Sequence, residues 1–229
     1  MTATPQAPNR WVRLDGEDHD GTIEAFELFS ARRALGLLKH KLGRLRLLEL
    51  LQEEIEAGNA FLRAQVQLSA GQEITGTTTL RAHGITAAQF TDWLSRAFGR
   101  ENVLLAAHPE HYSIHRAPGR DVNIVETLGN HVCSFLMRPW DDSVVAAQGL
   151  RSAAGGSANA RRSHMVLEDG TVVGSVSTAF DEEVDELTAR LSVTLPGTCG
   201  PLVEQHLEHF AVEFRNWILL AAAEQTATV

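Results

Sequence analysis

The last part of the chain, residues 201–224, is predicted to be a long helix with apolar side chains around most of its circumference. Two neighbouring stripes at helical spacing define that surface: Leu207, Phe210, Phe214, Ile218 and Ala221 in one, and Leu202, His206, His209, Glu213, Trp217 and Leu220 in the other. Pro201 is typical of a first helical turn. A helix with so little polar surface must be covered along its length, so the sequence predicts a sheet packed against it.

The segment before that helix has the patterns of such a sheet. Alternating side chains rich in valine, isoleucine and threonine predict strands at residues 74–82, 103–107, 112–115, 122–128, 132–136, 164–167, 171–179 and 186–193. Thr86 can cap a helix between the first two strands, with Phe90 and Trp93 on its apolar side. Helices first, then antiparallel strands and one long helix, predict an α+β fold.

The N-terminal part of the chain has two kinds of pattern. Residues 1–21 are mostly polar and aperiodic and predict a loose arm. Residues 22–67 carry apolar side chains at three- and four-residue steps and predict helices. Gly36 and Gly43 weaken that pattern and Gly58-Asn59 interrupts it, which favours two or three helices over one rod. We expect residues 22–229 to form a single domain.

Residues 32–46 of the helical region hold six basic side chains and no acidic one. One interpretation is a surface for a membrane or an acidic partner. The other is the solvated face of a packed helix, whose charge the glutamates that follow offset. In an acidic chain such a stretch could also form a contact in a homo-oligomer.

Charge and cysteine content narrow the class of protein. The net charge is −9, which is the wrong sign for binding nucleic acid through its phosphates. The two cysteines, Cys133 and Cys199, are too few for a disulfide framework and suit a reducing compartment as structural thiols. Neither a membrane span nor a signal peptide is evident. We therefore expect a cytoplasmic protein with no nucleic acid or membrane partner.

The first chemical signal lies on the C-terminal helix. His209 and Glu213 are four residues apart, so their side chains project together, and one helix can supply both to a single metal ion. The middle of their stripe is His206, His209 and Glu213 with apolar residues on both sides, and a carboxylate buried there requires a partner. The alternative to a metal site is a buried network of histidines and carboxylates.

A second signal is the histidine-rich stretch from His108 to His115. Its proline excludes a helix, so it is predicted to be a turn that enters a strand. His111 and His115 are an even number of residues apart and are expected on one face of that strand. Glu126 is predicted on an apolar-sided face of the next strand. Nitrogen and carboxylate ligands without thiolate fit Zn²⁺, or less specifically Mn²⁺ or Fe²⁺.

Taken in order, five segments resemble the zinc-dependent C–C hydrolases typified by 2,4-diacetylphloroglucinol hydrolase and phloretin hydrolase. The resemblance spans roughly residues 74–222 and is carried by His83-Gly-Ile-Thr through Trp93, His108-Pro-Glu-His-Tyr112, Val125-Glu-Thr-Leu-Gly129 with Phe135-Leu-Met-Arg-Pro139, His164-Met-Val-Leu-Glu-Asp-Gly170 through Phe180, and His209-Phe-Ala-Val-Glu-Phe-Arg-Asn-Trp217. It implies a helix-grip fold, similar to Bet v 1, for residues 68–229.

The resemblance also implies a zinc ion held by two histidines and two glutamates. By position these ligands are His111, Glu126, His209 and Glu213. The turn before the strand is one residue shorter than in the family, which leaves His108 as a rival to His111.

The implied reaction is hydrolysis of a carbon–carbon bond next to a ketone, with zinc polarising the carbonyl and activating water. His164 occupies the position of a family histidine near the reacting carbonyl and is predicted to polarise it or deliver a proton. His108 and His115 are the second choices for that role.

One departure from the family concerns the substrate, an acyl-phenol or polyketide-like ketone. The family holds its phenolic substrates with tyrosines, and Tyr112 is the only tyrosine here. That leaves two alternatives: a metal-dependent cyclase, lyase or isomerase acting on a natural-product intermediate, or a ligand carrier without catalysis.

Overall fold

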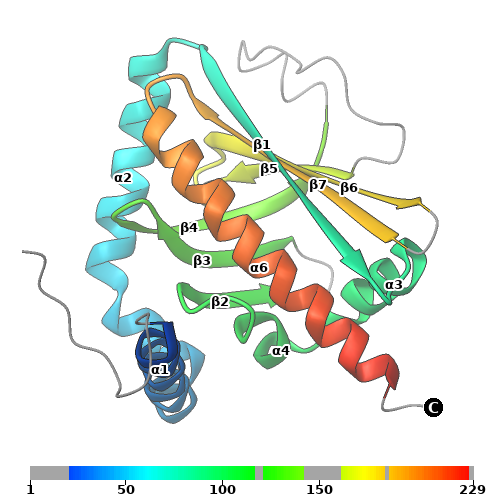
Figure 1. Ribbon diagram of the computed structural model, residues 1–229. Helices are drawn as coiled ribbons and strands as arrows, with labels where there is room; N and C mark the ends of the chain where they lie inside the picture. Colours follow the sequence, from blue (N-terminus) through cyan, green and yellow to red (C-terminus); the bar gives the residue numbers. More distant parts are fainter. Residues whose placement is uncertain (1–20, 117–120, 142–160, 184–185, 227–229) are drawn as a thin grey trace, which may run out of the picture. The chain divides into compact units, whose positions relative to one another are not determined.

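Seven antiparallel strands form one curled sheet in the computed structural model, which describes residues 21–116, 121–141, 161–183 and 186–226 (Figure 1). The strands follow one another in the order β1-β7-β6-β5-β4-β3-β2. Their bounds are β1 Glu73–His83, β2 His111–Arg116, β3 Val122–Leu128, β4 His131–Pro139, β5 Arg161–Val166, β6 Val172–Glu183 and β7 Glu186–Pro196. Apart from the β1–β7 pair, which brings the first strand beside the last, neighbours in the sheet are also consecutive in the sequence.

The C-terminal helix, α6, crosses this sheet as the sequence predicts (Figure 1). It spans Gly200–Thr226 and packs against β1, β7 and β3. The other helices are α1 Gly21–Leu50, α2 Gln52–Ser69, α3 Ala87–Ala97 and α4 Glu101–Leu105. A curled antiparallel sheet closed around one long C-terminal helix is the helix-grip fold, so the predicted α+β fold class is confirmed.

Contacts divide the chain into two compact units, Met1–Lys41 and Leu42–Val229. The division falls in α1, close to Gly43, whose backbone angles (φ 67°, ψ 167°) are not helical. The described part of the first unit is helical and leaves Phe26 and Phe29 exposed. The predicted N-terminal arm lies, except for Gly21, outside the described residues.

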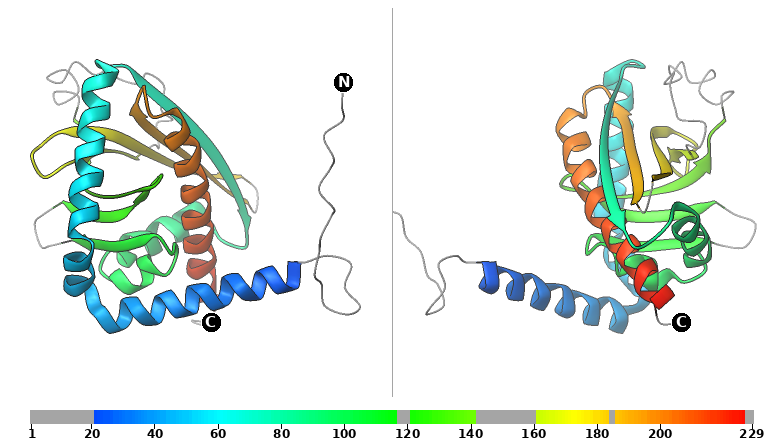
Figure 2. Two further views of the ribbon diagram at one scale, coloured as in Figure 1. Left: turned by 90° about the vertical axis from the view of Figure 1, so that its left-hand side faces the viewer. Right: turned by 45° about the vertical axis from the view of Figure 1, so that its right-hand side comes forward.

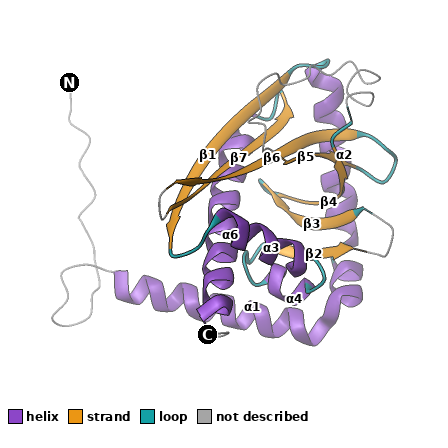
Figure 3. Ribbon diagram, turned by 90° about the vertical axis from the view of Figure 1, so that its right-hand side faces the viewer, coloured by secondary structure: helices purple, strands orange, loops and turns teal. Residues whose placement is uncertain are grey.

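Two clusters of buried side chains hold the second unit together. In the first, Phe214 and Trp217 of α6 pack with residues of α3 and α4, which lie beside the C-terminal half of α6 (Figure 3). In the second, Leu62 of α2 packs with Val203 of α6 and with the sheet; α2 and α6 are seen together in Figure 2. Burial raises the pKa of Cys133, in this second cluster, to about 12, which fits a structural thiol.

Two local predictions have different outcomes. Thr86 caps α3 as expected: its hydroxyl accepts a hydrogen bond from the backbone N–H of Gln89 at 3.1 Å. The strand expected at residues 103–107 is wrong, because these residues belong to α4 and the turn that follows it. Helical spacing buries Leu104 and Ala107 together, and the Leu104 carbonyl accepts a hydrogen bond from the Trp217 indole at 3.2 Å.

None of the helices in the described part of the chain is long and apolar enough to cross a lipid bilayer.

Gly58 does not break the helical region but allows α2 to approach the sheet closely. A Cβ atom at this position would overlap with the backbone carbonyl of Val132 in β4. The next residue, Asn59, accepts a hydrogen bond from the Ser134 backbone N–H at 3.0 Å. The glycine is therefore a contact point between helix and strand.

We expect Gly58→Ala to lower the free energy of unfolding by roughly 1–3 kcal/mol, because the added methyl group forces the helix away from the strand. Urea denaturation measures the change. The matched control is Gly36→Ala in α1, where a Cβ would meet nothing within 4 Å; helix propensity favours alanine there, so no loss of stability is expected. Equal behaviour of the two variants would contradict the packing role of Gly58.

Candidate metal centre

A β-bulge at the start of β2 sets which side chains of this strand face α6. His111 pairs with Glu126 of β3, but the register shifts before Ser113, which pairs with Val125. Tyr112 is the extra residue, so the alternation changes phase after it. The expectation that His111 and His115 share one face is therefore wrong. His115 lies on the other face, 3.8 Å from a carboxylate oxygen of Glu101.

Three buried side chains from three elements meet where the start of β2 and the end of β3 lie against α6. Nε2 of His111 lies 2.8 Å from Oε2 of Glu126 and 2.8 Å from Nε2 of His209. Nε2 of His209 lies 3.6 Å from the same Glu126 oxygen. All three residues are less than 7% exposed: His111 1%, Glu126 3% and His209 6%. The structure thus brings together a strand histidine, a strand carboxylate and a helix histidine, as the sequence analysis expected.

Glu213, one helical turn after His209, lies beside this group. Its Oε1 lies 3.5 Å from Nε2 of His111, and its side chain is buried. Ligand atoms at about 2.0–2.1 Å from a tetrahedral zinc ion lie about 3.3 Å from one another. The observed separations between donor atoms, 2.8 to 3.6 Å, are close to that value. The ligand atoms of His111, Glu126 and His209 all lie within 4.8 Å of one another, so two imidazole nitrogens and one carboxylate fit the donor set and spacing of a zinc site. Glu213, 3.5 Å from His111, is the candidate for a fourth donor.

The protonation of the cluster without a metal is uneven. Burial raises the pKa of Glu213 to about 8, and the Glu126 charge adds to this while His111 opposes it. Glu126 is equally buried, but the hydrogen bond from His111 and the nearby imidazoles hold its pKa near about 2. Burial lowers the pKa of His209 to about 2. Near pH 7, Glu126 is thus ionised and Glu213 is protonated. A divalent cation bound between them would favour the ionised form of both carboxylates.

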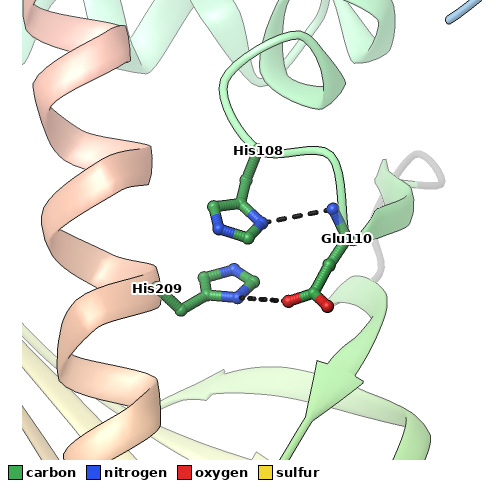
Figure 4. A group of neighbouring side chains, drawn as sticks. All are labelled: His108, Glu110 and His209. Carbon is green, nitrogen blue, oxygen red and sulfur yellow. Dashed lines mark hydrogen bonds and ion pairs between the residues drawn. The ribbon is translucent and has the colours of Figure 1, made fainter. Parts of the chain in front are cut away.

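The ring of His108, the rival ligand, lies against the ring of His209 (Figure 4). The two imidazole rings are stacked, with centroids 3.6 Å apart and an interplanar angle of 22°. Nδ1 of His108 accepts a hydrogen bond from the Glu110 backbone N–H at 3.2 Å. The nitrogens of two stacked rings lie in parallel planes and do not point at each other. The His111 and His209 rings are instead tilted by 42°, and their Nε2 atoms face each other. Ligand atoms of His108, Glu110 and His209 also lie within 4.8 Å of one another, but Glu110 is exposed, whereas His111, Glu126 and His209 are all buried. Burial therefore favours His111 as the ligand.

Two residues beside the cluster were not among the predicted site residues. Glu110 places a carboxylate oxygen 3.9 Å from Nδ1 of His209, the nitrogen that faces away from the cluster. His206 is 3% exposed, and its Nδ1 lies 3.9 Å from the second oxygen of Glu126. Carboxylates and histidines around metal ligands commonly fix their orientation. His206 could have been found from sequence, because it belongs to the same helical stripe as His209 and Glu213. Glu110 could not, because its position depends on the conformation of the turn before β2.

His164 is not brought to the cluster. Neighbouring residues of a strand point to opposite faces of the sheet, and Ser163 is the one that faces the cavity beside the cluster. His164 instead stacks on Trp140 with ring centroids 4.2 Å apart, and its Nε2 accepts a hydrogen bond from the Asp141 backbone N–H at 3.3 Å. The role of His164 near a reacting carbonyl is therefore not supported by its place in the fold.

A cavity of about 330 Å³ lies between the sheet and α6 and reaches the cluster. Glu126 and Glu213 contribute to its wall at that end. Most of the remaining lining is apolar: Leu94, Phe98, Val122, Ile124, Met137, Pro139, Val176, Phe180, Phe210, Phe214 and Trp217. A separate cleft of about 400 Å³, lined by His108, His206 and His209 among others, reaches the opposite side of the cluster. The four donor side chains thus separate an apolar cavity from a polar cleft.

Comparison with known proteins gives similarity at the level of fold. No protein-family model matches the chain, and no curated protein matches it. Among solved structures it is similar to the Zhui aromatase/cyclase from Streptomyces, with a TM-score of 0.45 and 11% identity over 68% of this chain and 96% of that one.

Two further structures are similar at the same level. A START superfamily protein from Mycobacterium smegmatis has a TM-score of 0.42 and 12% identity, over 61% of this chain and 93% of that one. The di-domain aromatase/cyclase StfQ of the steffimycin pathway has a TM-score of 0.39 and 11% identity, over 71% of this chain and 55% of that one. These values concern the fold alone, and they give no specific support to the hydrolase resemblance.

Proposed function

We propose that the protein is a metal-dependent enzyme that acts on a ketone-bearing, largely apolar small molecule bound in the cavity. The observation that carries this proposal is the four-donor cluster of His111, Glu126, His209 and Glu213, two members of which form the inner end of the cavity. A ligand in the cavity would lie directly against the site where a metal binds. Sites of this kind, apolar with a few convergent polar groups, are typical of small-molecule catalysis.

The reaction that we propose first is hydrolysis of a carbon–carbon bond next to a ketone in an acyl-phenol. Water is consumed: its hydroxyl joins the acyl carbon to give a carboxylic acid, and a proton replaces the acyl group on the ring. A divalent metal held by the four donors would supply a Lewis acid for the carbonyl and for water. The resemblance to zinc-dependent C–C hydrolases supports this choice of reaction.

The chain's own residues would position the substrate and move the protons. The aromatic wall formed by Phe210, Phe214 and Trp217 binds an apolar ring and excludes water from it. Of the three histidines predicted to transfer protons, only His108 lies beside the cluster, stacked on His209 and lining the polar cleft. We therefore assign proton transfer between cleft and cluster to His108 rather than to His115 or His164.

A second candidate, cyclisation or another metal-dependent rearrangement of a polyketide-like intermediate, is favoured by one observation. Tyr112 does not line the cavity; its hydroxyl lies 3.1 Å from that of Thr127. The cavity thus has no tyrosine to hold a phenol as the hydrolases do. Two of the similar solved structures are named as aromatase/cyclases, but the similarity is too distant to choose between reactions.

The test combines elemental analysis with product identification. Purified protein is expected to hold about one zinc ion per chain. It is then incubated with a panel of acyl-phloroglucinols and linear polyketide mimics, and the products are identified by mass spectrometry. A carboxylic acid with the deacylated phenol indicates hydrolysis, and a cyclised product indicates the second candidate. Binding without turnover that chelation leaves unchanged would contradict both and indicate a ligand carrier.

A further inference from the structure

Two arginines line the cavity at the edge of the sheet where β3 begins, whereas Glu126 lies near the other end of that strand. Arg116 is the last residue of β2, and Arg161 is the first residue of β5. Because β2, β3, β4 and β5 are antiparallel neighbours, the end of β2 and the start of β5 lie at the same edge of the sheet. Both arginines contribute to the cavity lining.

The strand register explains why both side chains face the cavity. After the bulge in β2, Arg116 pairs with Val122, and residues directly opposite each other on neighbouring strands share a face. Arg161 likewise pairs with Thr178 of β6. Val122 and Thr178 are themselves lining residues. The two guanidinium groups are thus placed by the sheet and not by a loop.

The charge of these arginines is not compensated within the described residues. In that part of the chain, neither guanidinium has a carboxylate oxygen within 4.0 Å. The one acidic lining residue near them, Asp121, already binds Nε of Arg138 at 2.8 Å. In a chain with a net charge of −9, this leaves a positive rim on an apolar cavity.

The two ends of the cavity therefore require different groups of one ligand. Glu126 and Val122 are four residues apart on β3, which is about 13 Å along a strand. A ligand that reaches from the cluster to the rim would be elongated, with an apolar middle. Arginine side chains at an apolar rim favour a carboxylate, sulfonate or phosphate group through charge-assisted hydrogen bonds.

We propose that the cavity selects an elongated, mostly aromatic or aliphatic molecule that carries an anionic group at the end bound by Arg116 and Arg161. The proposal rests on the proposed function in that the reacting ketone then lies at the opposite end, beside Glu126 and Glu213. The arginines are positioning residues and take no part in the chemistry.

Two fluorescent probes that differ by one charged group test the proposal without any turnover. The first is 1-anilinonaphthalene-8-sulfonate, which is anionic, and the second is N-phenyl-1-naphthylamine, which lacks the sulfonate. We expect the double variant Arg116→Gln/Arg161→Gln to weaken binding of the sulfonate probe by about tenfold or more. Binding of the neutral probe is expected to stay within about twofold, which also shows that the variant is folded and its cavity intact.

Controls separate the anion site from surface charge. The double variant Arg81→Gln/Arg96→Gln removes the same charge from exposed positions outside the cavity and is expected to bind both probes as the wild type does. Arg116→Lys/Arg161→Lys is expected to restore part of the lost affinity, and the neutral probe should displace the anionic one. Unchanged sulfonate binding in the glutamine variant, or an equal loss of both probes, would overturn the proposal. Because the titrations need no metal and no reaction, their outcome is independent of the metal analysis.

Discussion

Replacing His209 by alanine is expected to remove the bound metal and to lower turnover by at least about 1,000-fold. In the proposed site the imidazole would supply one of two nitrogen donors, and its Nε2 lies 2.8 Å from that of His111. A bound metal contributes several kcal/mol to stabilising a polarised carbonyl, and each 1.4 kcal/mol corresponds to a factor of about ten in rate. Zinc content by elemental analysis and turnover of the best substrate in the panel are the two measurements.

The control for this variant is His115→Ala. His115 was also predicted near the site, but the bulge in β2 turns it to the opposite face, toward Glu101. Its loss is expected to leave zinc content and turnover within about twofold of the wild type. A His209→Ala protein that is folded by circular dichroism and retains both zinc and activity would end the metal-dependent proposal.

In the metal-free protein, Glu213 is expected to lower stability as the pH rises from about 4.5 to about 8. Its pKa is about 8 in the folded chain, against the ordinary glutamate pKa of 4.5 that describes the unfolded one. Between pH 4.5 and pH 8, Glu213 is therefore protonated in the folded chain and loses its proton when the chain unfolds. The stability that Glu213 contributes is complete below pH 4.5 and is lost as the pH rises through 8, by up to about 1.4 kcal/mol per pH unit.

Glu213→Gln isolates this contribution because glutamine has a similar shape and does not titrate. The variant is expected to gain stability relative to the wild type as the pH rises, with a difference of several kcal/mol between pH 5 and pH 8. Urea denaturation in EDTA at three pH values measures it, and comparison of the two proteins cancels the opposite effect of His209. Glu204→Gln, at an exposed position of α6, is the control and should follow the wild-type profile. A constant difference across pH would contradict a buried, protonated Glu213.

The helical periodicity of residues 201–224 determined much of this protein before any tertiary structure was known. A helix with two apolar stripes requires a sheet beside it, and that requirement gives the fold class. The same periodicity places His209 and Glu213 on one stripe, because residues four apart on a helix lie on one face. Alternation along β3 placed Glu126 inward for an equally local reason.

The tertiary structure decided what depends on contacts between distant segments. No local pattern indicates the bulge at Tyr112, which separates His111 from His115 and turns Arg116 toward the cavity. The stacking of His108 on His209 exists only once α6 has packed against the turn before β2.

Other features were decided by the course of the sheet. His164 was expected at the site because of its place in the sequence. Side chains alternate along β5, however, and it is Ser163 that lines the cavity. The arginines at the rim, Arg116 and Arg161, are 45 residues apart in the sequence. They line one cavity because β2 and β5, separated by β3 and β4, place them at the same edge of the sheet. The sequence by itself thus determined which residues could share a face of one helix or strand. Only the packing of the sheet on α6 decided which of those faces meet, because that depends on register and on one extra residue in β2.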